Sequence, residues 1–163
     1  GGSLQAAYGD GDNALSISAV NGSFYQNQFG GYGTPDAGLF AFFASLEFDS
    51  FVTIGLLDDD GDAMLDLGID WTDFEAGGEI WTDNGSWFAT PDDAQVYEVG
   101  GQVLIGQFTV ADNDGVFGTI SLQGKNADGS NWSAVGVEFN TIPAPGALAL
   151  LGLAGLASRR RRS

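Results

Sequence analysis

The sequence contains no cysteine and no histidine among its 163 residues. Without cysteine the chain has no disulfides, no thiolate metal ligands and no cysteine nucleophile. Without histidine it lacks the commonest general base and the commonest ligand of transition metals. Both absences weigh against catalysis, and we therefore expect a non-enzymatic protein.

Positive charge is also scarce. Lys and Arg number 5 against 22 Asp and Glu, which gives a net charge of −17. Lys125 is the single basic residue before the arginine run Arg159, Arg160, Arg161 and Arg162. So acidic a body repels phosphate backbones and anionic membrane surfaces, which excludes nucleic acid as a partner. Cations are its natural partners, as counter-ions or as bound metal.

Residues 1–140 predict one all-β domain, an antiparallel β-sandwich of jelly-roll or immunoglobulin-like type. Period-two alternation of apolar and polar residues, broken by Gly, Asn and Asp, marks strands separated by turns. We expect strands at 14–20, 49–57, 101–111, 115–125 and 131–140. The later strands recur about every ten residues, as in a sandwich or small barrel.

One or two short helices are expected beside the strands. Thr34 is a candidate N-cap, with Pro35 at the first helical position and Asp36 in the first turn, for a helix over 34–45. The same start recurs at 90–95, where we expect a single turn.

Three loops concentrate aspartate, and the richest contains Asp58, Asp60 and Asp62. Alternate aspartates in a Gly-containing loop can supply several of the oxygens that calcium requires, so these three are the candidate metal ligands and calcium the candidate cofactor. With Gly61 at the sixth EF-hand position, however, leucines occupy positions one and twelve, and the EF-hand pattern fails. The alternative is that the loops are strand-connecting turns on an acidic surface.

The motif Trp-Thr-Asp occurs at Trp71 and again at Trp81, ten residues later, and two such copies would fit successive strands of a hairpin. Trp71, Trp81 and Trp87 are candidates for an exposed platform on which sugar rings stack. Packing of the same indoles in the core is the alternative.

The last residues have a different composition. Residues 142–145 contain Pro143, Ala144 and Pro145, and an apolar run covers 146–158. The basic cluster that follows consists of Arg159, Arg160, Arg161 and Arg162. A helix over 146–158 spans ~20 Å at ~1.5 Å per residue, whereas the hydrocarbon core of a bilayer is ~30 Å thick. We expect a transient membrane segment, stopped by these four arginines, which stay in the cytoplasm while the acidic body lies outside.

This tail resembles the PEP-CTERM sorting signal of exported bacterial proteins, in a Pro-Ala-Pro variant at Pro143–Pro145. The resemblance covers residues 141–163 alone. It implies export from a Gram-negative-type cell, recognition of the tail by an exosortase, and its removal near the proline motif. The mature body would then reach the cell surface or the extracellular matrix. A chain that begins at Gly1 instead of Met fits a processed product.

These observations predict an exported, non-enzymatic protein of the bacterial surface or extracellular matrix. The alternative is a calcium-dependent carbohydrate-binding or adhesive module, with extracellular polysaccharide as partner. A glycosidase acting through two carboxylates stays open as a third reading, because so many acids make a suitable pair easy to find by chance.

Overall fold

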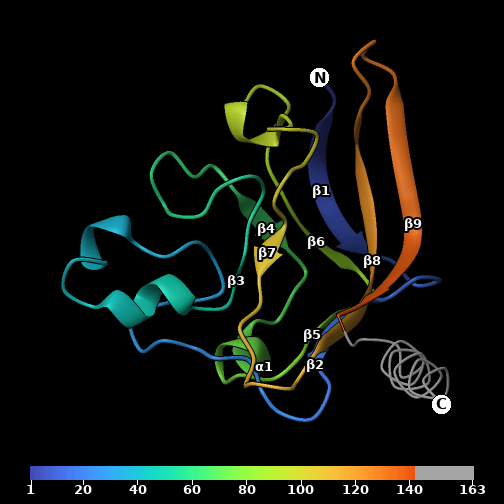
Figure 1. Ribbon diagram of the computed structural model, residues 1–163. Coiled ribbons are helices and arrows are strands. Elements are labelled where there is room, and N and C mark those ends of the chain that lie inside the picture. The colour runs from blue at the N-terminus through green and yellow to red at the C-terminus, as the bar shows by residue number, and fades with distance from the viewer. Residues whose placement is uncertain (142–163) are drawn as a thin grey trace, which may run out of the picture.

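The computed structural model describes residues 1–141 (Figure 1). Its largest element is a seven-stranded antiparallel sheet in the order β4-β6-β1-β8-β2-β5, with β9 added on the free side of β8. The strands are β1 (Ser3–Gly9), β2 (Leu15–Ala19), β4 (Leu65–Leu67), β5 (Ile80–Thr82), β6 (Gly85–Phe88), β8 (Val116–Lys125) and β9 (Asn131–Asn140).

Strands β1 and β2 lie end to end along one side of β8. Tyr8 of β1 is opposite Ser121, and Ser16 of β2 is opposite Thr119 on the same strand. Strands β6 and β5 form the next layer of pairing outward from β8, because β6 pairs with β1 and β5 pairs with β2. Gly9 stands where β1 leaves the sheet, and a Cβ there would overlap the backbone of neighbouring strands. A glycine is therefore required at this position.

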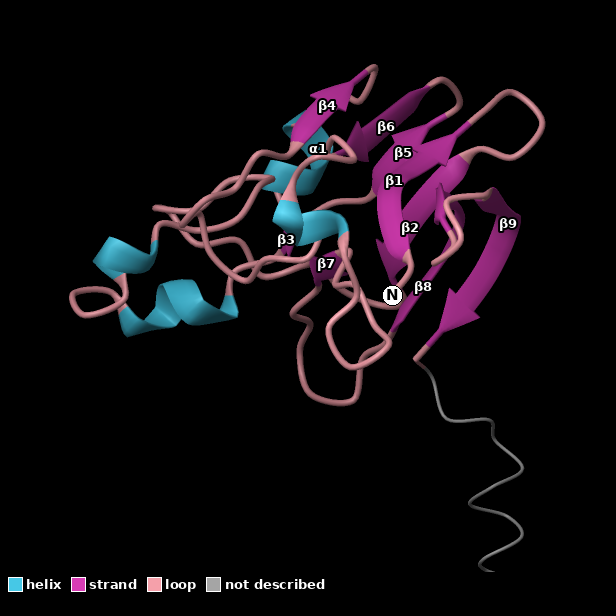
Figure 2. Ribbon diagram, turned by 90° about the horizontal axis from the view of Figure 1, so that it is seen from above, coloured by secondary structure: helices cyan, strands magenta, loops and turns pink. Residues whose placement is uncertain are grey.

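A second layer, built mainly from loops, covers one face of this sheet (Figures 1 and 2). It contains a two-stranded ladder of β3 (Phe51–Val52) and β7 (Gly106–Gln107). Its helices are short: the 3-10 helices η1 (Ala37–Leu39), η2 (Ala44–Phe48) and η3 (Ala94–Val96), and the single-turn α1 (Thr72–Glu75).

The hydrophobic core lies between the sheet and the loop layer. Side chains that alternate along the strands point into it, and aromatic rings from the loops fill the remaining space. Its fully enclosed members include Leu15, Ile17, Val52, Ile54, Phe74, Ile80, Trp87 and Val96. Trp87 donates from Nε1 to the carbonyl of Thr53, 3.1 Å away, which joins the sheet to the loop layer.

The predicted all-β, antiparallel class is confirmed. A sandwich is not shown, because the second layer of the described chain holds only strands of two residues instead of a comparable sheet. The segments 49–57 and 101–111 were expected to be full strands. Each contributes only two strand residues, and the rest runs in irregular conformation with backbone bonds such as Thr53 N to Ile105 O.

The strands at 14–20, 115–125 and 131–140 are confirmed as β2, β8 and β9. The expected helix at 34–45 is instead two 3-10 helices, with Asp36 and not Thr34 as the capping side chain. The single turn near 90–95 is present as η3, capped by Asp93. The hairpin expected from the repeated Trp-Thr-Asp is wrong, because the first copy leads into α1.

Candidate functional site

The face of the large sheet turned away from the core, which we call the outer sheet face, carries the candidate site. Strand pairing places Trp81 opposite Ser16, Ser16 opposite Thr119, and Thr119 opposite Glu138. Residues directly opposite each other share a face of the sheet. These four therefore form one row across β5, β2, β8 and β9.

The outer sheet face combines exposed apolar side chains with hydroxyl groups. Trp81 is 52% exposed and Phe117 is 45% exposed, while Leu65 and Leu67 of β4 are exposed by 54% and 71%. Phe117 pairs with Ser18, in the row next to that of Trp81. Neighbouring strands lie ~4.8 Å apart, and each residue advances ~3.4 Å along a strand. Phe117 is two strands and two residues away from Trp81, so the backbones beneath them are separated by ~12 Å. Two aromatic side chains thus stand within the reach of one extended ligand.

The inner residues of the same strands confirm which face is which. Leu15 and Ile17 alternate with Ser16 and Ser18 along β2. The two apolar side chains, Leu15 and Ile17, are completely buried. Ile80 beside Trp81 is likewise fully buried. Trp81 therefore contributes nothing to the enclosed core.

Two of the three predicted platform tryptophans are core residues. Trp87 has no exposed surface, and Trp71 retains 8%. Trp71 packs against Phe74 and Trp87, with centroid distances of 6.1 and 6.3 Å. Neither indole can present its face to a sugar, so the predicted platform is corrected to Trp81 alone among the three.

The candidate metal ligands do not converge. Asp62 accepts hydrogen bonds from the Thr34 hydroxyl, from Met64 N at 2.8 Å and from Gln95 Nε2 at 3.1 Å. Both of its carboxylate oxygens are thus occupied by protein donors.

Asp58 uses its carboxylate differently, accepting from the backbone N–H of Asp60 at 3.1 Å in a local turn. Within residues 1–141, no group of three or more acidic side chains is placed to hold a metal ion. These hydrogen bonds fit the alternative in which the loop is a turn, and calcium stays a prediction from the sequence.

The other acidic loops also use their carboxylates in turns. Asp10 accepts from the backbone N–H groups of Asp12 and Asn13, at 3.0 and 2.9 Å. These hydrogen bonds lower the pKa of Asp10. Asp114 accepts from Gly115 N and Asn21 N, which lowers its pKa in the same way.

Asp49 is the one described carboxyl group whose pKa is raised, and the cause is its burial. It has no exposed surface, and its Oδ1 accepts from Asn27 N at 2.7 Å. Its Oδ2 has no hydrogen-bond partner among the described residues. Because no surface of this carboxyl is open, it is not placed to protonate a substrate.

Sequence reasoning missed Phe117, Leu65 and Leu67 as members of the outer sheet face. Phe117 alternates with Val116 and Gly118 in a strand that was predicted, so its placement opposite to the core could have been read from period two. The leucines of β4 carried no such signal, because a three-residue strand is too short to show alternation.

The predicted sorting tail lies outside the described residues. The tail includes the apolar run 146–158. Its proline motif consists of Pro143, Ala144 and Pro145, and its membrane stop consists of Arg159, Arg160, Arg161 and Arg162. Within residues 1–141, none of the helices has the length and apolar character that crossing a bilayer demands. The tail therefore stays a prediction from the sequence.

Comparisons with known proteins add no relative to this description. No family model, curated protein or solved structure matches this chain.

Proposed function

We propose that the protein is an exported, non-enzymatic component of the surface or extracellular matrix of a Gram-negative-type bacterium. In this proposal residues 141–163 are a PEP-CTERM-like sorting tail. An exosortase-type enzyme recognises this tail and removes it after transient insertion in the inner membrane. The acidic domain of residues 1–140 is the part that works outside the cell.

The single observation that supports a specific role is the outer sheet face. Exposed Trp81 and Phe117 stand among the hydroxyls of Ser16, Ser18 and Thr119. Aromatic faces with nearby hydrogen-bonding groups are suited to ligands that are apolar on their faces and polar at their edges, as sugar rings are. We therefore favour the carbohydrate-binding alternative, with polysaccharide as partner.

The charge of the protein selects among polysaccharides. The chain carries −17 overall, and Glu138 belongs to the same row as Trp81. An anionic polymer would meet repulsion on approach, whereas an uncharged one would not. The expected ligand is an uncharged polysaccharide, bound without calcium because Asp62 and Asp58 already accept hydrogen bonds from the protein.

A binding role agrees better with the site than catalysis does. Glycoside hydrolysis needs a carboxylic acid with a raised pKa that touches the substrate. The pKa of Asp49 is raised, but this group is fully enclosed. The surface carboxylates Asp10, Asp70, Asp114 and Asp128, which are exposed or half-buried, have lowered pKa values instead, because they accept nearby hydrogen bonds.

Affinity electrophoresis tests the binding role. The purified chain is run through gels that contain an uncharged polysaccharide (hydroxyethylcellulose, xylan or dextran) or an anionic one (polygalacturonate). We expect retardation by at least one uncharged polymer and none by polygalacturonate. Retardation by the anionic polymer alone, or by none of the four, would contradict the proposal.

Mass spectrometry tests the sorting route independently. We expect the protein recovered outside the cell to end before Gly146. Recovery of extracellular chains that still contain Arg162 would contradict removal of the tail.

A further inference from the structure

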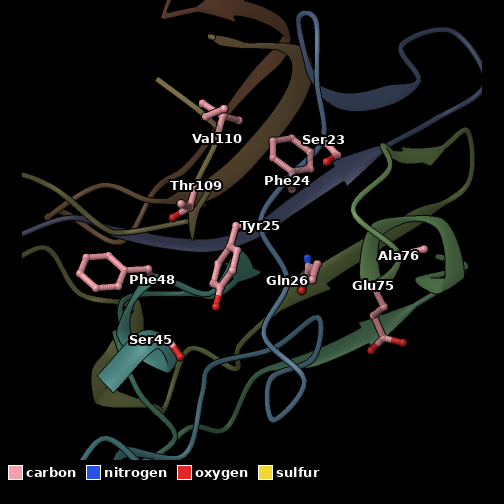
Figure 3. A pocket seen from close by; sticks show the side chains of 11 residues that line it. Ser23, Phe24, Tyr25, Gln26, Ser45, Phe48, Glu75, Ala76, Thr109 and Val110 are labelled. Carbon is pink, nitrogen blue, oxygen red and sulfur yellow. The ribbon is translucent and has the colours of Figure 1, made fainter. Parts of the chain in front are cut away.

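A second aromatic surface lies in the loop layer. An open cavity of about 750 Å³ is lined by residues from the segments 23–26, 45–48, 75–76 and 109–111 (Figure 3). We call it the aromatic groove. The large sheet separates it from the outer sheet face, because the loop layer covers the opposite face of that sheet (Figure 2).

Two exposed aromatic side chains line the aromatic groove. Tyr25 is 39% exposed and Phe48 is 61% exposed, and they come from separate parts of the chain. Figure 3 shows both rings at the groove, with Ser45 drawn below Tyr25 and Thr109 above it. The groove thus offers the same combination of aromatic rings and hydroxyl groups as the outer sheet face.

Hydrogen bonds tie Tyr25 to the segment that carries Phe48. Asn27 Nδ2 donates to the Tyr25 hydroxyl at 3.1 Å and to Ser45 Oγ at 3.0 Å. This single amide therefore joins the Tyr25 segment to η2. The Tyr25 hydroxyl accepts in this bond, which leaves its own proton free to donate to a ligand.

The backbone beneath both rings is fixed as well. Tyr25 N donates to Thr109 O at 2.8 Å, and Tyr25 O accepts from Ser50 N at 3.1 Å. Gln107 Nε2 donates to the carbonyls of Glu47 and Asp49, on either side of Phe48, at 3.0 and 2.8 Å. A site whose backbone is already ordered loses less conformational entropy when it binds.

Charge disfavours anionic ligands in the aromatic groove. Glu75 is the one charged residue among its lining side chains, and neither Lys nor Arg of the described chain lines it. An anionic ligand would find no counter-charge there, and a second copy of this acidic chain would be repelled. An uncharged, hydroxyl-rich chain meets neither obstacle.

We propose that the aromatic groove is a second site for uncharged polysaccharide, so that one domain holds two glycan chains on opposite sides. This inference rests on the proposed function, because it assigns the same class of ligand to both surfaces. A domain with two such sites would cross-link polymer chains, since each bound chain leaves the other surface free.

Isothermal titration calorimetry with uncharged oligosaccharides tests the second site. The ligands are cello-, xylo- and malto-hexaose, with hexagalacturonate as the anionic comparison. The variants are Tyr25→Ala/Phe48→Ala for the groove and Trp81→Ala/Phe117→Ala for the outer sheet face. Phe42→Ala is the matched control, because Phe42 is 78% exposed and does not line the groove. Circular dichroism and thermal melting of each variant establish that it is folded.

We expect two bound oligosaccharides per wild-type chain, one per chain of either double variant, and none when all four residues are replaced. The Phe42→Ala variant should keep both sites. Unchanged stoichiometry in Tyr25→Ala/Phe48→Ala, with loss of all binding in Trp81→Ala/Phe117→Ala, would overturn the second site and leave the proposed function standing. The reverse pattern would overturn the outer sheet face, and absence of binding to the wild type would overturn both.

If a groove variant fails to fold, Phe48→Leu replaces it. Phe48 is mostly exposed, and leucine keeps the apolar volume while removing the flat ring. Retention of both sites with unchanged affinity in that variant would also overturn stacking in the aromatic groove.

Discussion

The ring of Tyr32 lies parallel to the indole of Trp71, with 4.5 Å between the ring centroids and 6° between the planes. Both side chains donate to Asp66, the Tyr32 hydroxyl at 2.8 Å and Trp71 Nε1 at 3.0 Å. The bond to Asp66 raises the pKa of Tyr32. Asp66 belongs to β4, so this arrangement connects the edge of the large sheet to the aromatic part of the core.

Replacing Asp66 by alanine should destabilise the fold. The change removes the acceptor of two partly buried donors, and an unsatisfied buried donor costs about 1–3 kcal/mol. Chemical denaturation should show this decrease in the free energy of unfolding. The control is Asp60→Ala, which removes an exposed acid of equal charge and should change stability by less than about 0.5 kcal/mol. Equal effects of the two substitutions would contradict the role of Asp66.

Asp49 should make stability depend on pH in the direction opposite to that of most carboxyl groups. Burial raises the pKa of Asp49 above its ordinary value of 3.8. The folded state therefore binds this proton more tightly than the unfolded state does. The contribution of Asp49 to the free energy of unfolding is fully present below the pKa of the unfolded state. It is lost as the pH rises through the raised pKa of the folded state.

The comparison of wild type with Asp49→Asn isolates this effect, because all other carboxyl groups are shared. Thermal melting between about pH 4 and pH 7 should show the wild type losing stability relative to the variant as the pH rises. A difference in melting temperature that stays constant over this range would contradict the raised pKa of Asp49.

Gly30 should be intolerant of any side chain. A Cβ at this position would overlap the buried carboxylate of Asp49, because the 27–31 loop closes directly over that group. Crowding of this kind costs about 1–3 kcal/mol, so Gly30→Ala should lower the melting temperature. Gly11→Ala is the control, since nothing lies within 4 Å of a Cβ added there. Equal melting temperatures for the two variants would contradict the close contact between Gly30 and Asp49.

Calcium should not stabilise the domain specifically. Asp62 is occupied by Thr34, Met64 and Gln95, so a bound ion would have to displace these donors. Millimolar calcium should therefore shift the melting temperature by less than about 1 °C relative to the same concentration of magnesium, which controls for general screening of the acidic surface. A shift of several degrees with calcium alone would restore the predicted site at Asp58, Asp60 and Asp62.

The sequence predicted the strands that are long enough to show alternation. Strand β8 has ten residues, and its apolar positions Val116, Ile120 and Leu122 follow period two. Strand β1 was missed because Gln5, Ala6 and Ala7 have little intrinsic strand preference. It forms because β6 and β8 pair with it on both sides.

The candidate site was predictable only in part, for the same reason. Trp71 and Trp81 begin the same tripeptide, yet the first precedes a helix packed in the core and the second stands on the outer sheet face. Local sequence does not distinguish these environments, because burial depends on which layer lies opposite. The groove at Tyr25 and Phe48 depends on contacts between distant segments, such as Asn27 with Ser45, that no local pattern reveals.

Binding of an uncharged polysaccharide to Trp81→Ala tests the central proposal most directly. Trp81 is half exposed and lies outside the core, so the variant should stay folded with only a small loss of thermal stability. An aromatic side chain that anchors a ligand contributes roughly 2 kcal/mol or more. Affinity electrophoresis against the best-retarding uncharged polymer should therefore show weaker retardation of Trp81→Ala than of Phe42→Ala. Equal retardation of the two variants would contradict the assignment of the outer sheet face as the polysaccharide-binding surface.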